Sequence, residues 1–162
     1  MKKTPESDIN ETIMREVIRL SVENIDHGGG PFAAAVVREG KILATGVNSV
    51  AEDYDPTAHA EVNAIRKAAS AMERFRLDDC VLYTSCEPCP MCLGAIYWAG
   101  IPEVYYGNSR EDATRFGFKD EHIYEEAGRT AGERRVRFKR ILGEEAIEAF
   151  KRWDQKSDKI IY

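Results

Sequence analysis

Two short motifs carry residue types that bind a metal ion and move protons. One is a His-x-Glu sequence that begins at His59, and the other is a Pro-Cys-x-x-Cys sequence over residues 88–92. Zinc favours tetrahedral nitrogen and sulfur ligation, and a catalytic zinc site uses three protein ligands and leaves the fourth position to water or hydroxide. His59, Cys89 and Cys92 supply three such ligands. Glu61 remains as a carboxylate, so the sequence predicts one Zn²⁺ with Glu61 as the general acid and base beside its water.

The order of the two motifs indicates a reaction class. His-x-Glu followed by Pro-Cys-x-x-Cys is typical of deaminases that activate water on zinc and attack the ring carbon bearing an amino group. In that chemistry Glu61 takes a proton from the water and passes protons to the ring nitrogen and the departing ammonia.

A structural zinc site is the alternative interpretation. Four cysteines could close the coordination sphere completely, and they are Cys80, Cys86, Cys89 and Cys92. His59 and Glu61 would then be ordinary helix residues, and the chain would be a zinc-stabilised binding module. Chelation separates the two cases, because a structural site should unfold when metal is removed.

Both motifs are expected at the starts of helices. Residues two apart in a regular helix point about 200° away from each other, so His59 and Glu61 cannot share a site in mid-helix. Asp55-Pro56-Thr57 provides capping and first-turn residues directly ahead of them. Cys89 falls at a cap or first position, and Cys92 returns to the same face three residues later.

Apolar periodicity predicts the elements that carry these motifs. Helices are expected over residues 8–26, 58–72, 90–98 and about 144–153, and strands over 32–38, 41–47, 80–84, 104–107 and around Val136. Alternating strands and helices favour an α/β domain with its sheet covered on both faces. No repeat, linker or boundary interrupts the chain, so residues 1–162 are expected to form a single domain.

Charge and composition argue for a small-molecule substrate. The formal net charge is −5, whereas nucleic-acid binding relies on Lys and Arg to replace condensed counterions. The basic run over residues 134–140 is the exception, and its period of two also fits the solvated face of a strand. The longest apolar stretch, residues 91–101, is shorter than the roughly 20 residues that span a bilayer. With no apolar segment behind the first lysines, we expect a cytoplasmic protein with reduced thiols and no membrane partner.

At these motifs, and over nearly its whole length, the chain resembles the cytidine deaminase superfamily and, within it, the small bacterial guanine deaminases. The similarity is most specific at Gly29-Gly30-Pro31-Phe32, at residues 55–66 and at residues 77–98. It implies a cytidine deaminase-like fold, a three-layer α/β/α sandwich with a five-stranded mixed sheet. It also implies hydrolysis of guanine to xanthine and ammonia in purine catabolism or salvage.

The resemblance implies further site residues. Asn48 would bind the purine through its amide, Phe32 would flank the ring, and Ala60 would contact the base. Asp120 would contact the amino group and shuttle protons, although Lys119 replaces an acidic residue common there. From the residues alone, Asn48 fits a turn and Asp120 a helix cap equally well.

The C-terminal segment, about residues 143–162, resembles one that is exchanged between subunits of a homodimer. Its last residue, Tyr162, would then close the neighbour's active site, whereas a disordered tail is the ordinary expectation for a terminus. The rival functions are a transfer-RNA adenosine deaminase, with the same zinc motifs, and a deaminase of another purine-like base or nucleoside.

Overall fold

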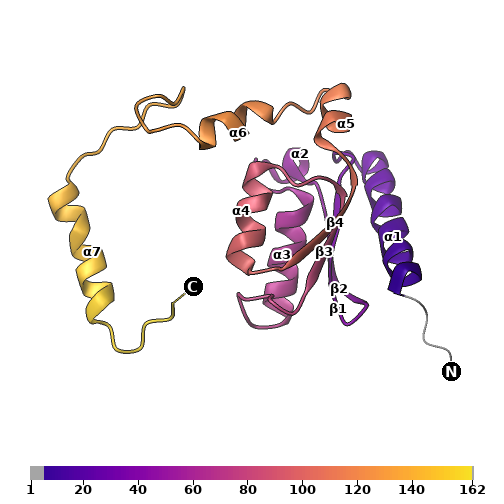
Figure 1. The fold of residues 1–162 in the computed structure, drawn as a ribbon, viewed down its shortest axis with the longest axis horizontal. Coiled ribbons are helices and arrows are strands. Elements are labelled where there is room, and N and C mark those ends of the chain that lie inside the picture. Colours follow the sequence, from indigo (N-terminus) through magenta and orange to yellow (C-terminus); the bar gives the residue numbers. More distant parts are fainter. Residues whose placement is uncertain (1–5, 162) are drawn as a thin grey trace. The chain divides into compact units, whose positions relative to one another are not determined.

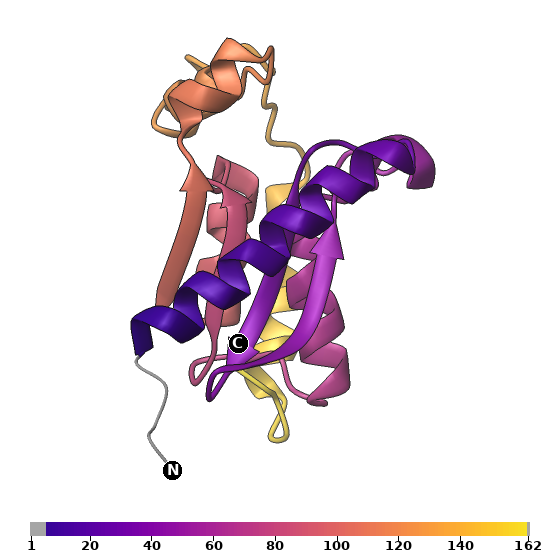
Figure 2. The ribbon, with the colours of Figure 1, turned by 90° about the vertical axis from the view of Figure 1, so that its right-hand side faces the viewer.

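A computed structural model describes residues 6–161, in which the chain forms two compact units, Met1–Asp120 and Glu121–Tyr162. The first unit contains a mixed sheet in the order β2-β1-β3-β4. Its strands are β1 (Ala33–Arg38), β2 (Lys41–Val47), β3 (Val81–Cys86) and β4 (Glu103–Asn108). β1 is antiparallel to both β2 and β3, while β3 and β4 are parallel. Consequently the carboxyl-terminal ends of β2, β3 and β4 all lie at the same end of the sheet (Figure 2).

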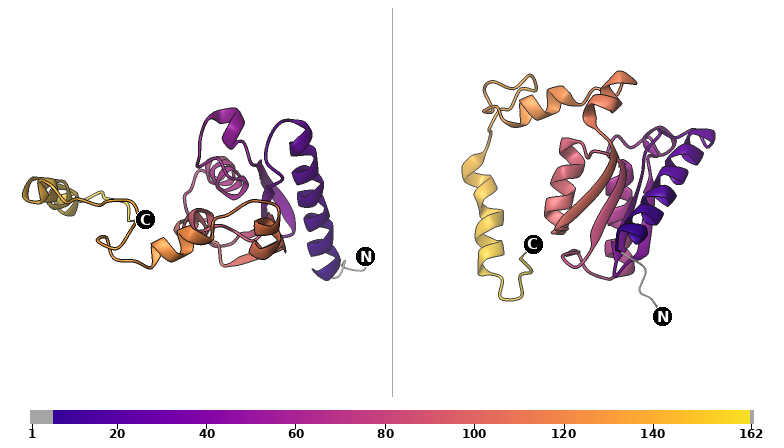
Figure 3. Two further views of the ribbon diagram at one scale, coloured as in Figure 1. Left: turned by 90° about the horizontal axis from the view of Figure 1, so that it is seen from above. Right: turned by 45° about the vertical axis from the view of Figure 1, so that its right-hand side comes forward.

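Helices cover both faces of this sheet, as the alternation of elements predicted. The helix α1 (Glu6–Asp26) lies on one face, and α3 (Ala60–Ala71) and α4 (Pro90–Ala99) lie on the other (Figures 1 and 3). Alternate residues of the strands build two cores. Ala35 and Tyr83 pack with Val17 of α1, whereas Val36 and Leu82 belong to the cluster on the α3 side.

A glycine in β2 allows α3 to approach the sheet closely. A Cβ atom on Gly46 would lie 2.2 Å from the carbonyl oxygen of Ala60 and 2.5 Å from the nitrogen of Ala64. Ala60, Ala64 and Ala68 are all completely buried. Small residues on both elements therefore bring the start of α3 against the backbone of β2.

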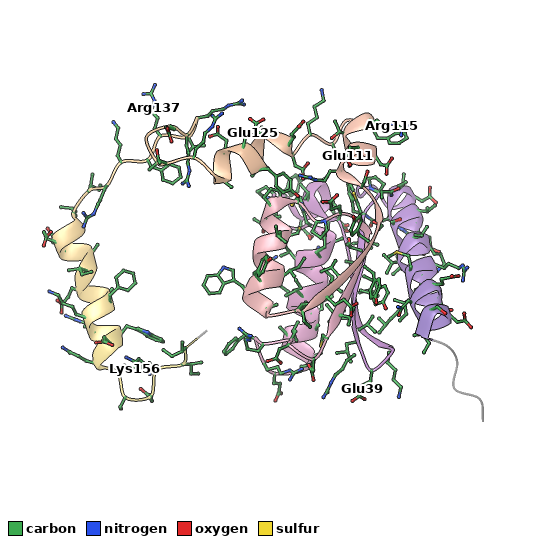
Figure 4. All side chains as sticks on the ribbon, in the orientation of Figure 1. Glu39, Glu111, Arg115, Glu125, Arg137 and Lys156 are labelled. Atoms are coloured by element: carbon green, nitrogen blue, oxygen red, sulfur yellow. The ribbon has the colours of Figure 1, made fainter. Side chains whose placement is uncertain are left out.

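Two short helices follow β2 and β4. The first, α2 (Val50–Asp53), lies between the strand predicted over 41–47 and the helix predicted over 58–72, where no element was predicted. The second, α5 (Arg110–Arg115), begins with a capping box in which the Ser109 side chain accepts from the Asp112 amide and the Asp112 side chain accepts from the Ser109 amide. In Figure 4, Glu111 and Arg115 of α5 lie at the opposite end of the sheet from Glu39, which marks the β1–β2 turn.

The second unit contains α6 (Glu121–Ala127) and α7 (Gly143–Gln155), and its described residues include no strand. The expected fifth strand around Val136 was therefore wrong, and the sheet has four strands instead of five. A strand needs a partner for its backbone groups. Here the Arg135 amide donates to the Glu126 carboxylate at 2.7 Å, and the Arg134 guanidinium lies over the Phe138 ring at 5.1 Å.

None of the helices in the described part of the chain is long and apolar enough to cross a bilayer. The expectation that residues 1–162 act as one domain stays a prediction.

Candidate metal centre

The first motif lies where α3 begins. His59 is the N-cap residue of α3, with an extended backbone at φ −73° and ψ 154°, and Glu61 is in the first turn. The turn before it is fixed by Asp55, whose side chain accepts from the Thr57 amide at 2.8 Å. The helix start predicted for His59 and Glu61 is confirmed.

The second motif lies where α4 begins, directly after β3. Cys89 is the N-cap residue, and Pro90 occupies the first turn, where its missing N–H costs no hydrogen bond. The loop before Cys89 is tied to the end of β4, because the Glu87 amide donates to the Asn108 carbonyl at 2.8 Å. The Glu87 carboxylate also pairs with Arg110 of α5 at 3.2 Å.

The two helix starts bring three donor atoms together. Nδ1 of His59 lies 3.5 Å from Sγ of Cys89 and 3.6 Å from Sγ of Cys92. Tetrahedral zinc with ordinary Zn–N and Zn–S bonds places neighbouring nitrogen and sulfur ligands about 3.5 Å apart. The three residues therefore fit zinc in both donor chemistry and spacing, and all three ligand atoms lie within 4.8 Å of one another.

Glu61 lies beside this cluster. Its Oε2 accepts from the Cys92 thiol at 3.4 Å, and the residue is only 6% exposed. Burial raises the pKa of the Glu61 carboxyl above its ordinary value. A raised pKa makes the carboxylate a stronger base, which suits a group that takes up and returns protons.

The two thiols share one environment and divide their protons unequally. The hydrogen bond from Cys92 lowers the pKa of Cys89 to about 4, and its contact with His59 acts in the same direction. The same pairing raises the pKa of Cys92. Thiolate is the form that binds metal, so the lowered pKa of Cys89 favours its role as a ligand.

The other two cysteines are not part of the cluster. Among the residues that the structure describes, His59, Cys89 and Cys92 are the group spaced to hold a metal ion. The Cys80 thiol faces Asp79, and the Cys86 thiol faces the carbonyl of Ser109. The geometry thus favours an open site with three ligands over a closed site with four cysteines.

The remaining predicted site residues lie at the end of the sheet where β2, β3 and β4 terminate, or outside the described residues. Asn48 directly follows β2, and its backbone N–H donates to the Phe32 backbone carbonyl at 3.0 Å. Ala60 is the first residue of α3. Asp120 interacts electrostatically with His59. Tyr162 lies outside the described residues.

Sequence reasoning missed Phe118. Its ring packs edge-on against Phe32, with ring centroids 4.7 Å apart and an interplanar angle of 81°. The segment around Phe118 has no regular periodicity, so its position two residues before Asp120 was the available signal.

Comparison with known proteins places this site in a family. Residues 7–108 match the family model described as the cytidine and deoxycytidylate deaminase zinc-binding region. The chain belongs to this deaminase family. The residues that fit zinc all lie within the matched region, and the zinc-binding domain predicted from the motifs is confirmed.

Individual relatives align with different portions of this chain. A guanine deaminase of Bacillus subtilis is 46% identical over 154 residues, which are 94% of this chain and 99% of the relative. The X-ray structure of guanine deaminase from Bacillus subtilis superposes with a TM-score of 0.91 at 46% identity, covering 94% of this chain and 98% of that one. The structure of guanine deaminase from Nitrosomonas europaea gives a TM-score of 0.64 at 35% identity and covers 66% of this chain and 63% of that one. A chloroplastic tRNA(adenine(34)) deaminase of Arabidopsis thaliana is 41% identical over 99 residues, which are 61% of this chain and 8% of the relative.

Proposed function

We propose that this protein is a zinc-dependent guanine deaminase that hydrolyses guanine to xanthine and ammonia. The observation that carries the chemistry is the buried Glu61 carboxylate beside the three zinc-type donors. The choice of guanine rests on the match to a guanine deaminase along 94% of this chain, whereas the transfer-RNA deaminase matches over 61%. The formal net charge of −5 also disfavours a nucleic-acid substrate.

His59, Cys89 and Cys92 would hold the zinc ion. When bound, zinc supplies a water that is nucleophilic near neutral pH. Glu61 takes one proton from the water that attacks C2 of guanine and delivers it to the adjacent ring nitrogen. It then carries the second proton to the amino group, so that the C2–N bond breaks and ammonia leaves.

The purine would be held by residues around this centre. The Asn48 amide offers both a donor and an acceptor to the polar edge of the base. Phe32 and Phe118, already in edge-to-face contact, offer an apolar wall for the ring. Asp120 would contact the amino group and assist its protonation, and Ala60 would contact the base at the helix start. We place this reaction in the cytoplasm.

An assay of several substrates tests the proposal. Zinc-loaded protein is given guanine, adenine, cytosine, guanosine and transfer RNA in parallel, and ammonia and xanthine are measured. Equal amounts of both products from guanine, in preference to the other substrates, would support the proposal. The matched control is Glu61→Gln, which keeps the size of the side chain and removes its acid. Ammonia from another substrate would overturn the choice of guanine, and none from any substrate would overturn the enzymatic function.

We further propose a homodimer in which residues 143–162 are exchanged, so that the two units of each chain act as one functional domain with a neighbour. The helices of the second unit contain no buried residue. On α7, Ile147, Phe150 and Trp153 are 42%, 71% and 40% exposed. A segment that buries so little apolar surface cannot offset the entropy of ordering its chain, so a covering surface is required.

Complementation between two inactive variants tests the exchange. Glu61→Gln removes the acid from the site, and Tyr162→Ala removes the residue that would close the neighbour's site. Mixing the two proteins after unfolding and refolding should restore guanine turnover, because a mixed dimer has one site that lacks neither residue. Two folded variants that stay inactive when mixed, or a monomer in sedimentation experiments, would refute the exchange.

A further inference from the structure

Asn24, near the end of α1, holds two backbone carbonyls at the candidate site. Its Nδ2 donates to the Gly30 carbonyl and to the Asn48 carbonyl, both at 2.8 Å. A carboxamide nitrogen has two hydrogens, so both are used. Asn24 is only 7% exposed, and its backbone carbonyl accepts from the Gly29 backbone amide at 2.9 Å. One buried side chain thus joins the glycine-rich loop to the end of β2.

The glycines of this loop allow the close approach. A Cβ atom on Gly29 would lie 2.2 Å from Nδ2 of Asn24 and 2.6 Å from the Asn48 carbonyl oxygen. A Cβ atom on Gly30 would lie 3.1 Å from Oδ1 of Asn48 and 3.4 Å from Cδ2 of Phe32. The Asn48 carboxamide therefore lies directly against the Gly30 backbone and beside the Phe32 ring.

A second amide holds the same strand end from the opposite face of the sheet. Nδ2 of Asn63, on α3, donates to the Val47 carbonyl at 2.9 Å and to the Ser49 hydroxyl at 3.1 Å. Asn63 thus fixes the residues on each side of Asn48, while Asn24 fixes Asn48 itself. Since α1 and α3 cover opposite faces of the sheet, Asn48 is restrained from both sides (Figure 3).

We propose that Asn24 is a positioning residue for the purine base, acting through Asn48 and the Gly30–Phe32 loop. This role rests on the proposed function, in which Asn48 and Phe32 contact guanine. Asn24 has no contact with the three zinc-type donors or with Glu61 among its hydrogen bonds in the described structure. Its loss should therefore weaken binding of the base and leave the chemical step nearly unchanged.

The test uses Asn24→Asp and Asn24→Ser in the zinc-loaded, full-length protein. Asn24→Asp keeps the shape of the side chain but replaces the donating nitrogen with an acceptor that faces two carbonyls. We expect KM for guanine and the Kd of 8-azaguanine, measured by calorimetry, to rise about tenfold or more, as for the loss of at least one hydrogen bond. The kcat should stay within about threefold of wild type, because uniform binding is what is lost. Asn24→Ser, whose hydroxyl has one hydrogen, should show the smaller effect.

Asn10 provides the matched control. Its Oδ1 accepts from the Tyr83 hydroxyl at 2.6 Å in a part-buried contact, and it lines a cavity of about 220 Å³ with residues of the β1–β2 turn, at the end of the sheet away from α5. Asn10→Ala should leave KM and the Kd of 8-azaguanine unchanged, whatever it does to the melting temperature. Equal effects of the Asn10 and Asn24 variants on binding would reduce the role of Asn24 to general stability and overturn the proposal.

A double-mutant cycle tests whether Asn24 acts through Asn48. In an Asn48→Ala background, Asn24→Asp should lower the affinity for 8-azaguanine by less than it does in the wild-type protein, because the side-chain amide that it positions is absent and only its hold on the Gly30–Phe32 loop remains. The positioning role would be overturned if the losses of affinity from the two substitutions were fully additive. It would also be overturned if folded Asn24 variants bound 8-azaguanine as the wild-type protein does, or if both Asn24 variants failed to fold. A wild-type protein that neither deaminates guanine nor binds 8-azaguanine would instead refute the proposed function.

Discussion

Replacing Gly46 with alanine should separate α3 from the sheet and disturb the metal centre, although Gly46 contacts no ligand side chain. The added methyl group would lie 2.2 Å from the Ala60 carbonyl oxygen and 2.5 Å from the Ala64 nitrogen. Even a C–H···O contact keeps carbon and oxygen about 3.3 Å apart, so the helix must move by roughly 1 Å. Both obstructing atoms belong to the backbone, so no side-chain rotation can relieve the clash.

The size of the effect follows from this displacement. Overpacking a well-filled core costs about 1–3 kcal/mol and occasionally more. For a protein of this length, a loss of 1–3 kcal/mol lowers the melting temperature by roughly 2–12 °C. Because Ala60 lies between His59 and Glu61, a displacement of about 1 Å at this point can also reduce turnover by about 100-fold.

Gly94→Ala is the matched control. Gly94 lies inside α4, and a Cβ atom there would meet nothing within 4 Å. Alanine in a helix interior should stabilise by roughly 0.5–1 kcal/mol relative to glycine. We would compare melting curves, zinc content and guanine kinetics of the two variants. A Gly46→Ala protein with the melting temperature and kcat/KM of wild type would refute the argument that α3 is held in place by close contact with β2.

Three further variants or treatments test the site and the core. Glu61→Gln should keep its zinc and lower kcat by about 10²–10⁴-fold, as for a lost general acid and base, and loss of the metal instead would make Glu61 a ligand or a structural residue. Chelation should abolish turnover and make Cys89 accessible to alkylation. Cys80 and Cys86 should stay unlabelled, because Cys80 is completely buried and burial raises the pKa of Cys86 to about 11. Equal labelling of all four thiols would instead indicate that the protein had unfolded. Leu82→Ala, at a completely buried position, should lower the free energy of unfolding by about 2–5 kcal/mol without changing KM, and a raised KM would mean that the core also shapes the site.

Sequence periodicity predicted most of the first unit because burial of one face repeats at regular intervals. The helix predicted over 8–26 is α1 (Glu6–Asp26), and the strands predicted over 32–38 and 41–47 are β1 and β2. The same reasoning failed around Val136, where alternating residues resemble a strand but the backbone has no strand as partner. An alternating pattern of apolar and polar residues indicates which side chains a strand could bury. Whether the strand forms also depends on a second segment of the chain that pairs with its backbone.

The metal centre was predictable because its chemistry restricts residue types and spacing. One histidine and two cysteines at the starts of two helices are typical of a zinc site and fit few other structural roles. Phe118 and Asn24 were not predictable in the same way. Asn24 resembles any polar residue near the end of an amphipathic helix, and its importance depends on two carbonyls brought to it by the loop and by β2. Such contacts exist only after the tertiary fold has formed.

The family match ends before two residues of the candidate substrate site. The region matched by the family model, residues 7–108, contains His59, Glu61 and both cysteines, but it ends before Phe118 and Asp120. The transfer-RNA deaminase aligns with 99 residues of this chain, and the Bacillus subtilis guanine deaminase aligns over 154 residues. The segment after β4 should therefore affect guanine turnover more than zinc binding. Asp120→Asn should lower kcat for guanine while zinc content and melting temperature stay at wild-type values, and a loss of zinc in this variant would show that the two roles are not separable.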